Sequence, residues 1–539
     1  MRQYEVFELT FDGENINHDW ADADINAIFK DPNGEKKVKG FYAGEGKYKV
    51  RYLPEAVGPV SWKVSGAVNA EGCENCEPAD ETHHGIVRAE KTHLKFSDNR
   101  WFFSFGTTVY ALAHQDDALT EKTFETLANS PFNKVRMCIF PKHYDYNLNE
   151  PKYFPFEVNA NMHYRYDRGE TFNEGAFLRE KAKYWNVKEP NFDFWNALEE
   201  KITRLEQMDI QVDLILFHPY DRWGFSYFSK EQNRVYLDYA IRRLSAFPNI
   251  WWSLANEYDL CGAKDINDWH EIENFVAEND PYHHLLSNHN CIPAYDFTRP
   301  HMTHCSLQKR TMGLVPEYMR MTGKPVLYDE CAYEGNLKQT WGSISGEEMS
   351  NRFWKVMTHG GYCTHGEVYL DENTENLDEA VLWWAKGGVL KGTSPQRIAF
   401  LRDIIEEIGQ PLEPYQFGLA AILNHMNSDF ESVKDLIPET FLHAHAYTKN
   451  ASLVELKRHE DAEMTFAGHA GEDAYLFYYG TDCCARVDIE VSNKNTYRID
   501  VIDTWNMTRE TVLCGVSGQM EVRLTGRPYM AILAVKESL

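Results

Sequence analysis

The sequence predicts an α/β fold in which a (β/α)8 TIM barrel is flanked by two all-β, sandwich-like domains. The middle of the chain alternates short apolar strands with amphipathic helices, which is typical of a parallel α/β fold. Both ends of the chain instead show the period-two alternation of antiparallel strands. With 539 residues, the chain is longer than one hydrophobic core usually organises. We therefore expect a β-sandwich over 1–92, a barrel over 93–435 and a second β-sandwich over 436–539.

The N-terminal region is predicted to be a small β-sandwich. Apolar and polar residues alternate in the runs 4–11, 25–31 and 48–54. Asn33-Gly34 provides a turn signal between two such runs. No convincing helical pattern interrupts them.

Eight strands are expected in the barrel, and helices separate most of them. The expected strands are 101–112, 134–140, 212–219, 250–257, 284–290, 304–308, 325–330 and 361–368. Eight strand–helix units in roughly 310 residues fit a barrel with insertions. An open, doubly wound sheet is the less favoured alternative, because no Gly-rich phosphate loop follows the first strand.

Three apolar stripes at helical spacing support the helices of the barrel. They comprise Leu198, Ile202 and Leu205; Leu237, Ile241 and Leu244; and Ile398, Leu401, Ile405 and Ile408. The last stripe begins after Ser394-Pro395 and ends at Gly409, as a helix with a first-turn proline and a C-terminal glycine does. Ser345 and Glu348 have the spacing of a capping box. From about 450, alternating runs such as AYLFYYG and RVDIEV indicate the second β-sandwich.

Composition narrows the classes of partner. The formal net charge of −27 argues against nucleic acid and against an anionic membrane surface, since both need a basic face. No apolar stretch resembles a secretion signal or a membrane span. The 11 cysteines are scattered, most of them in apolar runs, which fits reduced thiols in the cytoplasm. We expect a cytoplasmic protein with no cofactor and no metal, which can form a homo-oligomer.

Two carboxylates stand where barrel enzymes carry their chemistry, at the C-terminal ends of strands. The fourth expected strand ends in Asn256-Glu257 and the seventh in Asp329-Glu330. Glycoside hydrolysis needs such a pair, because one group protonates the leaving oxygen while the other attacks the anomeric carbon. A shift of one residue in register would let Asp329 replace Glu330.

The segments NIWWSLANEYD (249–259) and GKPVLYDECAYEG (323–335) resemble the strand-four and strand-seven signatures of clan A retaining glycoside hydrolases. The order of β-sandwich, apiosidase-like barrel and C-terminal β-domain is similar to that of glycosidases from bacteria that degrade plant glycans. The resemblance implies that Glu257 is the acid/base and Glu330 the nucleophile. It also implies a plant-type oligosaccharide or glycoside as the substrate.

Further polar and aromatic residues at or near the strand ends are candidates for binding sugar hydroxyls and rings. The candidates are His114, Arg136, His218, Asn256, His289, Gln308, Glu367 and Trp383. Asn256 could bond a sugar 2-hydroxyl, and Arg136 could keep Glu330 ionised while Glu257 stays protonated. Each of these residues could instead have a structural role. The long, ring-rich stretch 141–190 is expected to narrow the site and to favour exo-cleavage.

Two other functions fit parts of this pattern. A metal-dependent hydrolase could use the histidines that gather around strands five and six, although no HxH or HExxH motif occurs. These histidines are His283, His284, His289, His301 and His304. A non-catalytic carbohydrate-binding protein could use the same barrel mouth without turnover.

Overall fold

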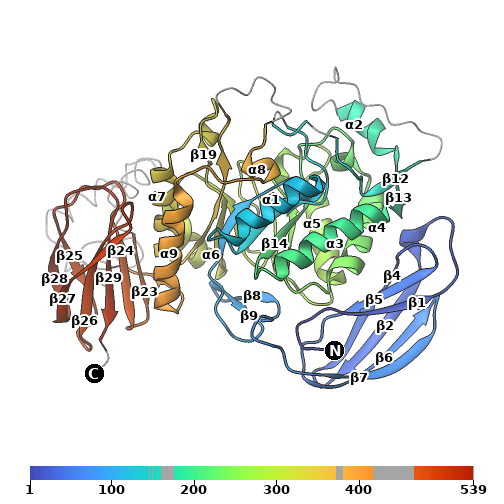
Figure 1. The fold of residues 1–539 in the computed structure, drawn as a ribbon, viewed down its shortest axis with the longest axis horizontal. Coiled ribbons are helices and arrows are strands. Elements are labelled where there is room, and N and C mark those ends of the chain that lie inside the picture. The colour runs from blue at the N-terminus through green and yellow to red at the C-terminus, as the bar shows by residue number, and fades with distance from the viewer. Residues whose placement is uncertain (145, 149, 160–174, 372–379, 417–465, 538–539) are drawn as a thin grey trace. The chain divides into compact units, whose positions relative to one another are not determined.

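The fold is taken from a computed structural model (Figure 1), which describes residues 1–144, 146–148, 150–159, 175–371, 380–416 and 466–537. The chain forms two compact units. The first contains residues 1–308, 322–344 and 364–392, and the second contains residues 309–321, 345–363 and 393–539. Each unit is described by itself below.

The N-terminal part of the first unit is the predicted sandwich of two antiparallel sheets. One sheet has the order β1 (Phe7–Asp12), β5 (Lys47–Tyr52) and β4 (Phe41–Tyr42). The other has the order β3 (Gly34–Lys39), β2 (Ile25–Asp31), β6 (Gly58–Gly66) and β7 (Ala70–Cys76). Alternate residues of β2 are buried, and Phe29 stacks on Tyr52 of the facing sheet with 4.1 Å between ring centroids. The expected turn at Gly34 is present, with φ at 132°. The hairpin of β8 (Val87–Glu90) and β9 (His93–Phe96) follows the sandwich.

All eight predicted barrel strands are present and form one sheet. They are β10 (Phe105–Thr108), β11 (Lys134–Cys138), β14 (Gln211–Phe217), β15 (Ile250–Ala255), β16 (Leu286–Ser287), β17 (Cys305–Gln308), β18 (Val326–Glu330) and β20 (Tyr362–His365). Their order, β16-β15-β14-β11-β10-β20-β18-β17, is the cyclic order of a barrel opened between β16 and β17. Across that opening, Thr303 N donates to Leu286 O at 2.9 Å and Ser287 Oγ donates to His304 O at 2.7 Å. The (β/α)8 prediction is therefore confirmed.

Helices of the first unit lie around these strands (Figure 1), and the apolar stripes at 198–205 and 237–244 predicted two of them. They are α1 (Asp117–Ala128), α2 (Gly175–Ala182), α3 (Phe192–Glu206), α4 (Lys230–Leu244), α5 (Ile266–Asn279) and α8 (Trp383–Lys386). Leu198, Ile202 and Leu205 of α3 are fully buried. The short antiparallel pair of β12 (Phe156–Val158) and β13 (Trp185–Pro190) lies within the predicted long insertion. The short strands β19 (Glu334–Gly335) and β21 (Glu367–Val368) pair in parallel.

The second unit combines helices with the C-terminal sheets. Its helices are α6 (Val315–Thr322), whose last residue falls in the first unit, α7 (Gly346–Thr358) and α9 (Ser394–Ile408). Helix α9 has Pro395 in its first turn and ends at Gly409 with φ at 68°, as predicted. At α7, Ser345 accepts from Glu348 N as expected, but the Glu348 carboxylate bonds Asn351 and Arg352 of its own helix.

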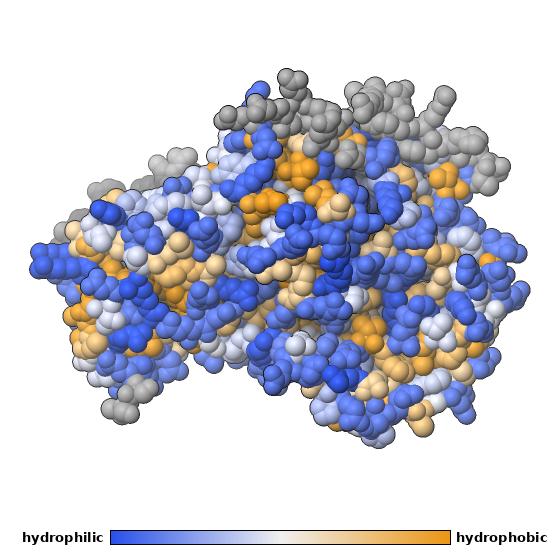
Figure 2. Space-filling model, viewed as in Figure 1, coloured by the Kyte–Doolittle hydropathy of each residue, from blue (hydrophilic) through white to orange (hydrophobic). Residues whose placement is uncertain are grey.

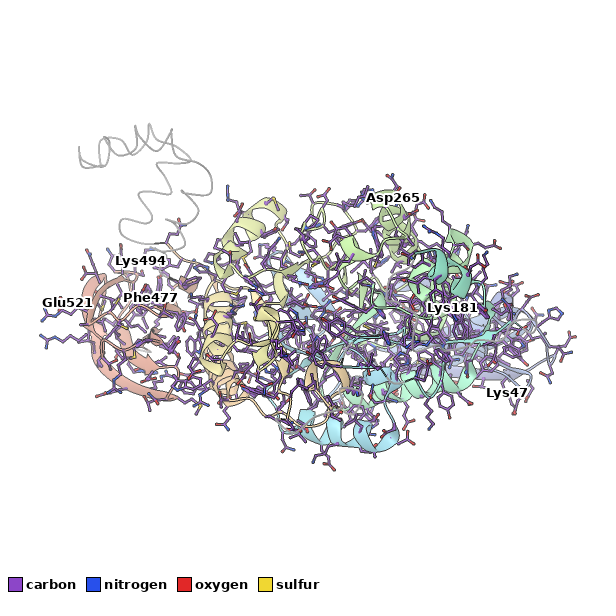
Figure 3. All side chains as sticks on the ribbon, turned by 90° about the horizontal axis from the view of Figure 1, so that it is seen from above. Lys47, Lys181, Asp265, Phe477, Lys494 and Glu521 are labelled. Carbon is purple, nitrogen blue, oxygen red and sulfur yellow. The ribbon has the colours of Figure 1, made fainter. Side chains whose placement is uncertain are left out.

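The C-terminal sheets are all antiparallel, as predicted. The larger sheet has the order β22 (Glu413–Pro414), β23 (Phe466–Ala470), β24 (Ala474–Tyr478), β29 (Met530–Lys536), β26 (Tyr497–Asp503) and β27 (Thr508–Val516). The smaller pairs β25 (Arg486–Glu490) with β28 (Gln519–Arg523). In Figure 3, Phe477 lies among these strands and Glu521 lies at their outer edge, in line with full burial of the first and exposure of the second. The predicted boundary at 435/436 lies outside the described residues, so the domain limits stay predictions.

The surface in view is mainly polar. Figure 2 shows a mainly hydrophilic face with separate hydrophobic patches. Among the described residues, no helix has the length and hydrophobicity needed to cross a membrane. All 11 cysteines are free thiols.

A buried ionic cluster joins the N-terminal sandwich to the barrel helices. Arg51 of β5 binds Glu199 of α3 with both terminal nitrogens, at 2.7 and 2.9 Å, and Arg243 of α4 binds the same carboxylate at 2.5 Å. These two guanidinium groups hold the pKa of Glu199 down at about 2, although burial acts to raise it. Glu199 is therefore the only anion that Arg51 and Arg243 share within the described part of the chain.

Replacing Glu199 by alanine is expected to lower the free energy of unfolding by about 3–5 kcal/mol, because two buried guanidinium groups lose their common anion. Urea denaturation at pH 7 measures this loss, and Glu200→Ala on the exposed side of the same helix is the matched control. Because the folded-state pKa lies below the ordinary 4.5, the contribution of Glu199 is present above pH 4.5 and is lost as the pH falls towards 2. Equal stability of the two variants at pH 7 would contradict the assignment.

Candidate active site

Glu257 and Glu330 lie at the C-terminal ends of β15 and β18, as the sequence predicted. Glu330 is the last residue of β18, and Glu257 follows β15 by two residues. Both are buried, with 5% and 7% of their surface exposed. Glu257 has φ 53° and ψ 57°, a left-handed conformation that is uncommon for a side chain of this size. Such local strain persists where the surrounding structure fixes it, most often at functional sites.

A tyrosine hydroxyl orients each carboxylate. Tyr220, after β14, donates to Glu257 Oε2, and Tyr110, after β10, donates to Glu330 Oε1. The Tyr333 hydroxyl lies 3.4 Å from that of Tyr110. Burial and the adjacent carboxylates raise the pKa of Tyr110 and of Tyr220 far above 10. Both phenols therefore stay protonated and remain hydrogen-bond donors.

The two carboxyl groups are coupled electrostatically. Burial, followed by the charge of Glu257, raises the pKa of Glu330 to about 7. Arg136, Tyr110 and Lys142 act in the opposite direction. When two acids interact this strongly, the proton belongs to the pair. Near neutral pH the pair can therefore hold one proton and one negative charge.

Arg136 makes only a long contact with this pair of carboxyl groups. Its Nη1 lies 4.0 Å from Glu330 Oε1 and 3.3 Å from the Tyr110 hydroxyl, while its Nε donates to Asp213 Oδ2 at 2.9 Å. It lowers the pKa of Glu330, as we expected, but burial and Glu257 outweigh it. Asp213 is thus the main anionic partner of Arg136.

Asp329, the alternative nucleophile in the sequence analysis, is engaged inside the barrel. Its Oδ1 accepts from Lys134 Nζ at 2.5 Å and from Thr364 Oγ1 at 3.0 Å. Its Oδ2 accepts from Ser306 Oγ at 2.5 Å. Lys134 and Arg136 hold the pKa of Asp329 far below its usual range, although burial acts to raise it. With both oxygens occupied, Asp329 serves as an internal anion of the barrel.

Sequence reasoning missed the cation of the site. Lys142 follows β11, is 4% exposed, and places Nζ 3.9 Å from the Tyr110 ring centroid and 4.4 Å from that of Tyr220. The Trp384 ring lies 4.7 Å from the same atom. Tyr110, Tyr220 and Lys142 all follow barrel strands, and this position was the available signal. Tyr110 falls inside the apolar run 101–112, where a tyrosine is typical of a packed strand, and Lys142 and Tyr220 belong to neither an apolar pattern nor a pair of acids.

Several predicted sugar-binding residues have buried polar atoms with no protein partner among the described residues. These atoms are Arg136 Nη2, Asn256 Oδ1, His289 Nε2 and Gln308 Oε1, together with both polar atoms of the Asn288 side chain. They come from β11 and from the ends of β15, β16 and β17. His289 also binds Glu257 directly, because its Nδ1 accepts from the Glu257 backbone N–H at 3.4 Å. A ligand rich in hydroxyl groups could satisfy such atoms.

His114 and His218 contact the barrel backbone. His114 Nε2 lies 2.9 Å from Ile139 O and its ring stacks on Phe194, while His218 Nε2 lies 3.1 Å from Phe140 O. Burial lowers the pKa of both rings, to about 4 and about 3. Both are therefore neutral, and their sugar-binding role stays a prediction.

Glu367 and Trp383 are held by neighbouring backbone and side-chain groups. The Glu367 carboxylate accepts from the backbone N–H groups of Lys391 and Gly392, at 2.5 and 2.7 Å. Trp383 Nε1 donates to Thr107 Oγ1 at 2.8 Å. Trp384, the next residue, contributes the ring that faces Lys142. Sugar contact by Glu367 and Trp383 stays a prediction.

The histidines of the metal-dependent alternative do not form a ligand group within the described residues. His284 instead binds Asp280 and the Phe247 carbonyl. Two groups of three side chains could hold an ion, and they contain other residues. One is Glu5, Asp80 and His83, and the other is Glu334, His365 and Glu367.

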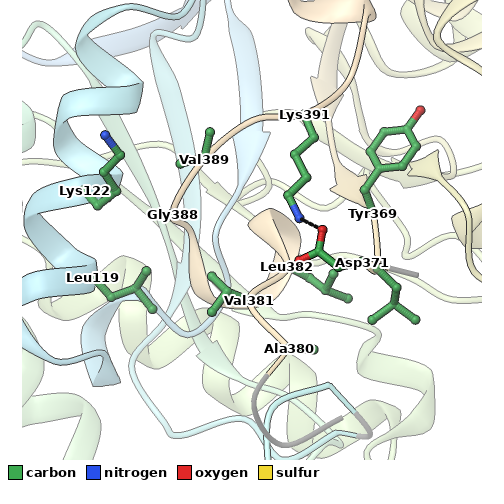
Figure 4. A pocket seen from close by; sticks show the side chains of 11 residues that line it. Leu119, Lys122, Tyr369, Asp371, Ala380, Val381, Leu382, Gly388, Val389 and Lys391 are labelled. Carbon is green, nitrogen blue, oxygen red and sulfur yellow. Dashed lines mark hydrogen bonds and ion pairs between the residues drawn. The ribbon is translucent and has the colours of Figure 1, made fainter. Parts of the chain in front are cut away.

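A separate pocket of about 260 Å³ opens beside α1 (Figure 4). Its lining includes Leu119, Val381 and Val389, and the ion pair of Lys391 with Asp371 at 2.7 Å. No residue of this lining bonds Glu257 or Glu330. The pocket is therefore distinct from the carboxylate pair.

Comparisons with known proteins agree with this architecture. A family model described as an apiosidase-like catalytic domain matches residues 88–411. Domains of unknown function match residues 1–67 (DUF5060) and 463–534 (DUF5605). A search of curated proteins finds no match.

Solved structures extend the likeness to the whole chain. A candidate glycoside hydrolase from Bacteroides vulgatus ATCC 8482 is 30% identical, with 99% of each chain covered and a TM-score of 0.81. A family 5 glycoside hydrolase from the same organism is 14% identical, with 84% of this chain and 94% of that chain covered and a TM-score of 0.54. The second likeness shows the fold alone. Because the catalytic-domain model covers more than half of the sequence, this chain belongs to the family of proteins with an apiosidase-like catalytic domain.

Proposed function

We propose that this protein is a retaining glycoside hydrolase in which Glu257 is the acid/base and Glu330 is the nucleophile. The observation that carries the proposal is the coupled pair of buried carboxyl groups at the ends of β15 and β18, each bonded by a phenol. Such a pair, with one proton between two acids, is the state from which double displacement begins. Arg136 lies beside Glu330, which favours the charge on that residue and the proton on Glu257.

The reaction follows from these positions. Glu257 transfers its proton to the glycosidic oxygen as Glu330 attacks the anomeric carbon, so the C–O bond to the leaving alcohol breaks and a glycosyl ester forms. Glu257, now a carboxylate, takes a proton from water, and the resulting attack releases the sugar and restores Glu330.

The substrate is proposed to be a plant-type oligosaccharide or glycoside, cleaved from one end. The unpartnered atoms of Asn256, His289 and Gln308 would bind sugar hydroxyls. Part of the insertion that we expected to narrow the site, residues 160–174, lies outside the described residues. An exo-acting enzyme releases one small product from the earliest time points, whereas a ladder of oligosaccharides would contradict exo-cleavage. Chromatography of the products tests this.

A panel of aryl glycosides tests the function itself. NMR of the first-formed product on the best substrate is expected to show the anomeric configuration of the substrate. Inverted configuration would refute the double displacement. Binding of glycans without any turnover would favour a carbohydrate-binding protein, and loss of activity on chelation would favour the metal-dependent alternative.

Glu330→Gln is expected to lower kcat by more than about 10³-fold, because the nucleophile is lost. Glu257→Ala should spare only ester formation from substrates with good leaving groups, which need no acid. Hydrolysis of the ester should be slow without the base, and added azide should restore turnover as a glycosyl azide. Glu278→Gln, an exposed acid on α5, is the matched control and should leave kcat unchanged. Full activity in either active-site variant would refute the assignment.

Glu330→Gln is also expected to stabilise the folded protein at alkaline pH. The raised pKa of Glu330, about 7 against the ordinary 4.5, marks the loss of the last proton from the pair, so the second negative charge destabilises the folded state progressively as the pH rises from 4.5 through 7. The gain should be on the order of 3 kcal/mol at pH 8 and should vanish near pH 4.5. Denaturant unfolding across this range measures it, and a variant that is less stable at every pH would contradict the shift.

A further inference from the structure

Lys142 is a buried cation without an anionic contact in the structure. Its side chain makes no ion pair and no hydrogen bond with any residue of the described ranges. The side chain nevertheless lies within the barrel mouth with only 4% of its surface exposed. Burial of an unpaired ammonium is costly, so some other interaction has to hold its charge in place.

Aromatic rings provide that interaction. The Nζ atom lies 3.9 Å from the Tyr110 ring centroid, 4.4 Å from the Tyr220 centroid and 4.7 Å from the Trp384 centroid. Each distance is within the range of a cation–π contact. Tyr110 and Tyr220 are the same phenols that bond Glu330 and Glu257. Lys142 therefore lies against both phenols and within electrostatic reach of both carboxylates.

Lys142 is the cation that balances the charge of the catalytic pair, because the other cations of the barrel interior have anionic partners of their own. Arg136 is paired with Asp213, and Lys134 with Asp329. Glu257 and Glu330 are the carboxylates whose charges act most strongly on Lys142, and Arg136, at 4.0 Å from Glu330, is shared with Asp213. Two carboxylates against one ammonium are in excess by one negative charge, and a single proton on the pair removes that excess.

Other titratable groups near the pair do not supply a second free cation. Those facing the pair or Lys142 are Tyr110, Arg136, Cys138, Tyr144, His218, Tyr220, His289, Cys291 and Tyr333. Burial keeps the pKa of His218 and of His289 low, so both imidazoles are neutral. Arg136 already serves Asp213.

We propose that Lys142 is a positioning residue that holds the Glu257–Glu330 pair at one shared proton in both steps of the reaction. The proposal rests on the retaining mechanism above. Double displacement requires the single negative charge on Glu330 and the proton on Glu257 when the substrate is bound. When the glycosyl ester forms, Glu330 becomes neutral and the proton leaves on the alcohol, so the same single charge moves to Glu257. A cation that contacts both phenols faces the charge at either place.

Lys142→Met tests the role of the charge, because methionine keeps an unbranched apolar stem against the rings and loses the ammonium. Without the cation both ionisations of the pair become less favourable, so both limbs of the pH profile of kcat/KM should move to higher pH. An opposite charge at this range shifts a carboxyl pKa by about 1–3 units, and we expect displacement of at least about one pH unit. Lys142→Arg keeps the charge and should retain the wild-type limbs.

Lys264→Met is the matched control. Lys264 is half-buried and also lies against a ring, 4.5 Å from the Phe217 centroid, but it donates to Ser226 O, and its nearest charged groups are outside the pair. It should leave the pH profile in place. If the limbs of the pH profile stay in place in Lys142→Met and only KM rises, the proposal is overturned and Lys142 is a substrate contact instead.

A readout without turnover separates this proposal from the mechanism. Carboxyl ¹³C NMR of glutamate-labelled protein should show one proton lost from the pair at higher pH in Lys142→Met, and in Lys142→Gln if the methionine variant fails to fold. Unchanged titration would overturn the role of Lys142 even in an active enzyme. Activity in Glu257→Gln or Glu330→Gln would instead overturn the catalytic assignment on which the proposal rests.

Discussion

Burial of Glu257 and Glu330 within reach of each other's charge is the constraint on which the rest of the barrel mouth depends. Two adjacent carboxylates cannot both be ionised cheaply away from water, so a proton or a cation has to accompany them. The surrounding residues divide this task. Phenols bond the carboxylates, Arg136 biases the charge towards Glu330, and Lys142 balances the pair as a whole. Burial of two neighbouring carboxyl groups thus lowers the stability of the fold and also provides the proton and the charge that the proposed reaction uses.

The buried charges of the barrel interior beneath the pair are matched. Lys134, Arg136, Asp213 and Asp329 are each 3% exposed or less, and they form two close ion pairs. Ser306 and Thr364 donate further hydrogen bonds to the Asp329 carboxylate. Buried ionic groups add little net stability, but breaking one pair leaves an isolated charge. Arg136 can therefore reach towards Glu330 without leaving Asp213.

Sequence alone predicted the elements that periodicity governs. Leu198, Ile202 and Leu205 identified α3, and apolar runs located all eight strands, because burial on one face leaves a repeating pattern. Glu257 and Glu330 could be singled out because a strand end fixes where its last side chains go. Their shared proton could not be predicted, since it depends on burial and on distances between strands.

The residues that sequence reasoning missed gave no sign of a shared site. Tyr110 lay within the expected strand 101–112, and Lys142 and Tyr220 follow strands, and nothing in the local sequence shows that these three segments converge. Glu367 lies at the end of a strand, and that position alone does not show which groups bond its side chain. Its carboxylate is bonded by the Lys391 and Gly392 backbone, which comes from a later part of the chain.

The way Lys142 is held bears directly on how charge can move during catalysis. An ion pair would fix the ammonium beside one of the two carboxylates. It would then stabilise the negative charge in only one of the two steps of the reaction. Aromatic rings attract a cation over their whole face and accept no proton, so Lys142 can serve Glu330 before the ester forms and Glu257 afterwards. The phenols that provide two of these rings also bond the two carboxylates. Orientation of the acids and placement of their common cation thus depend on the same two side chains.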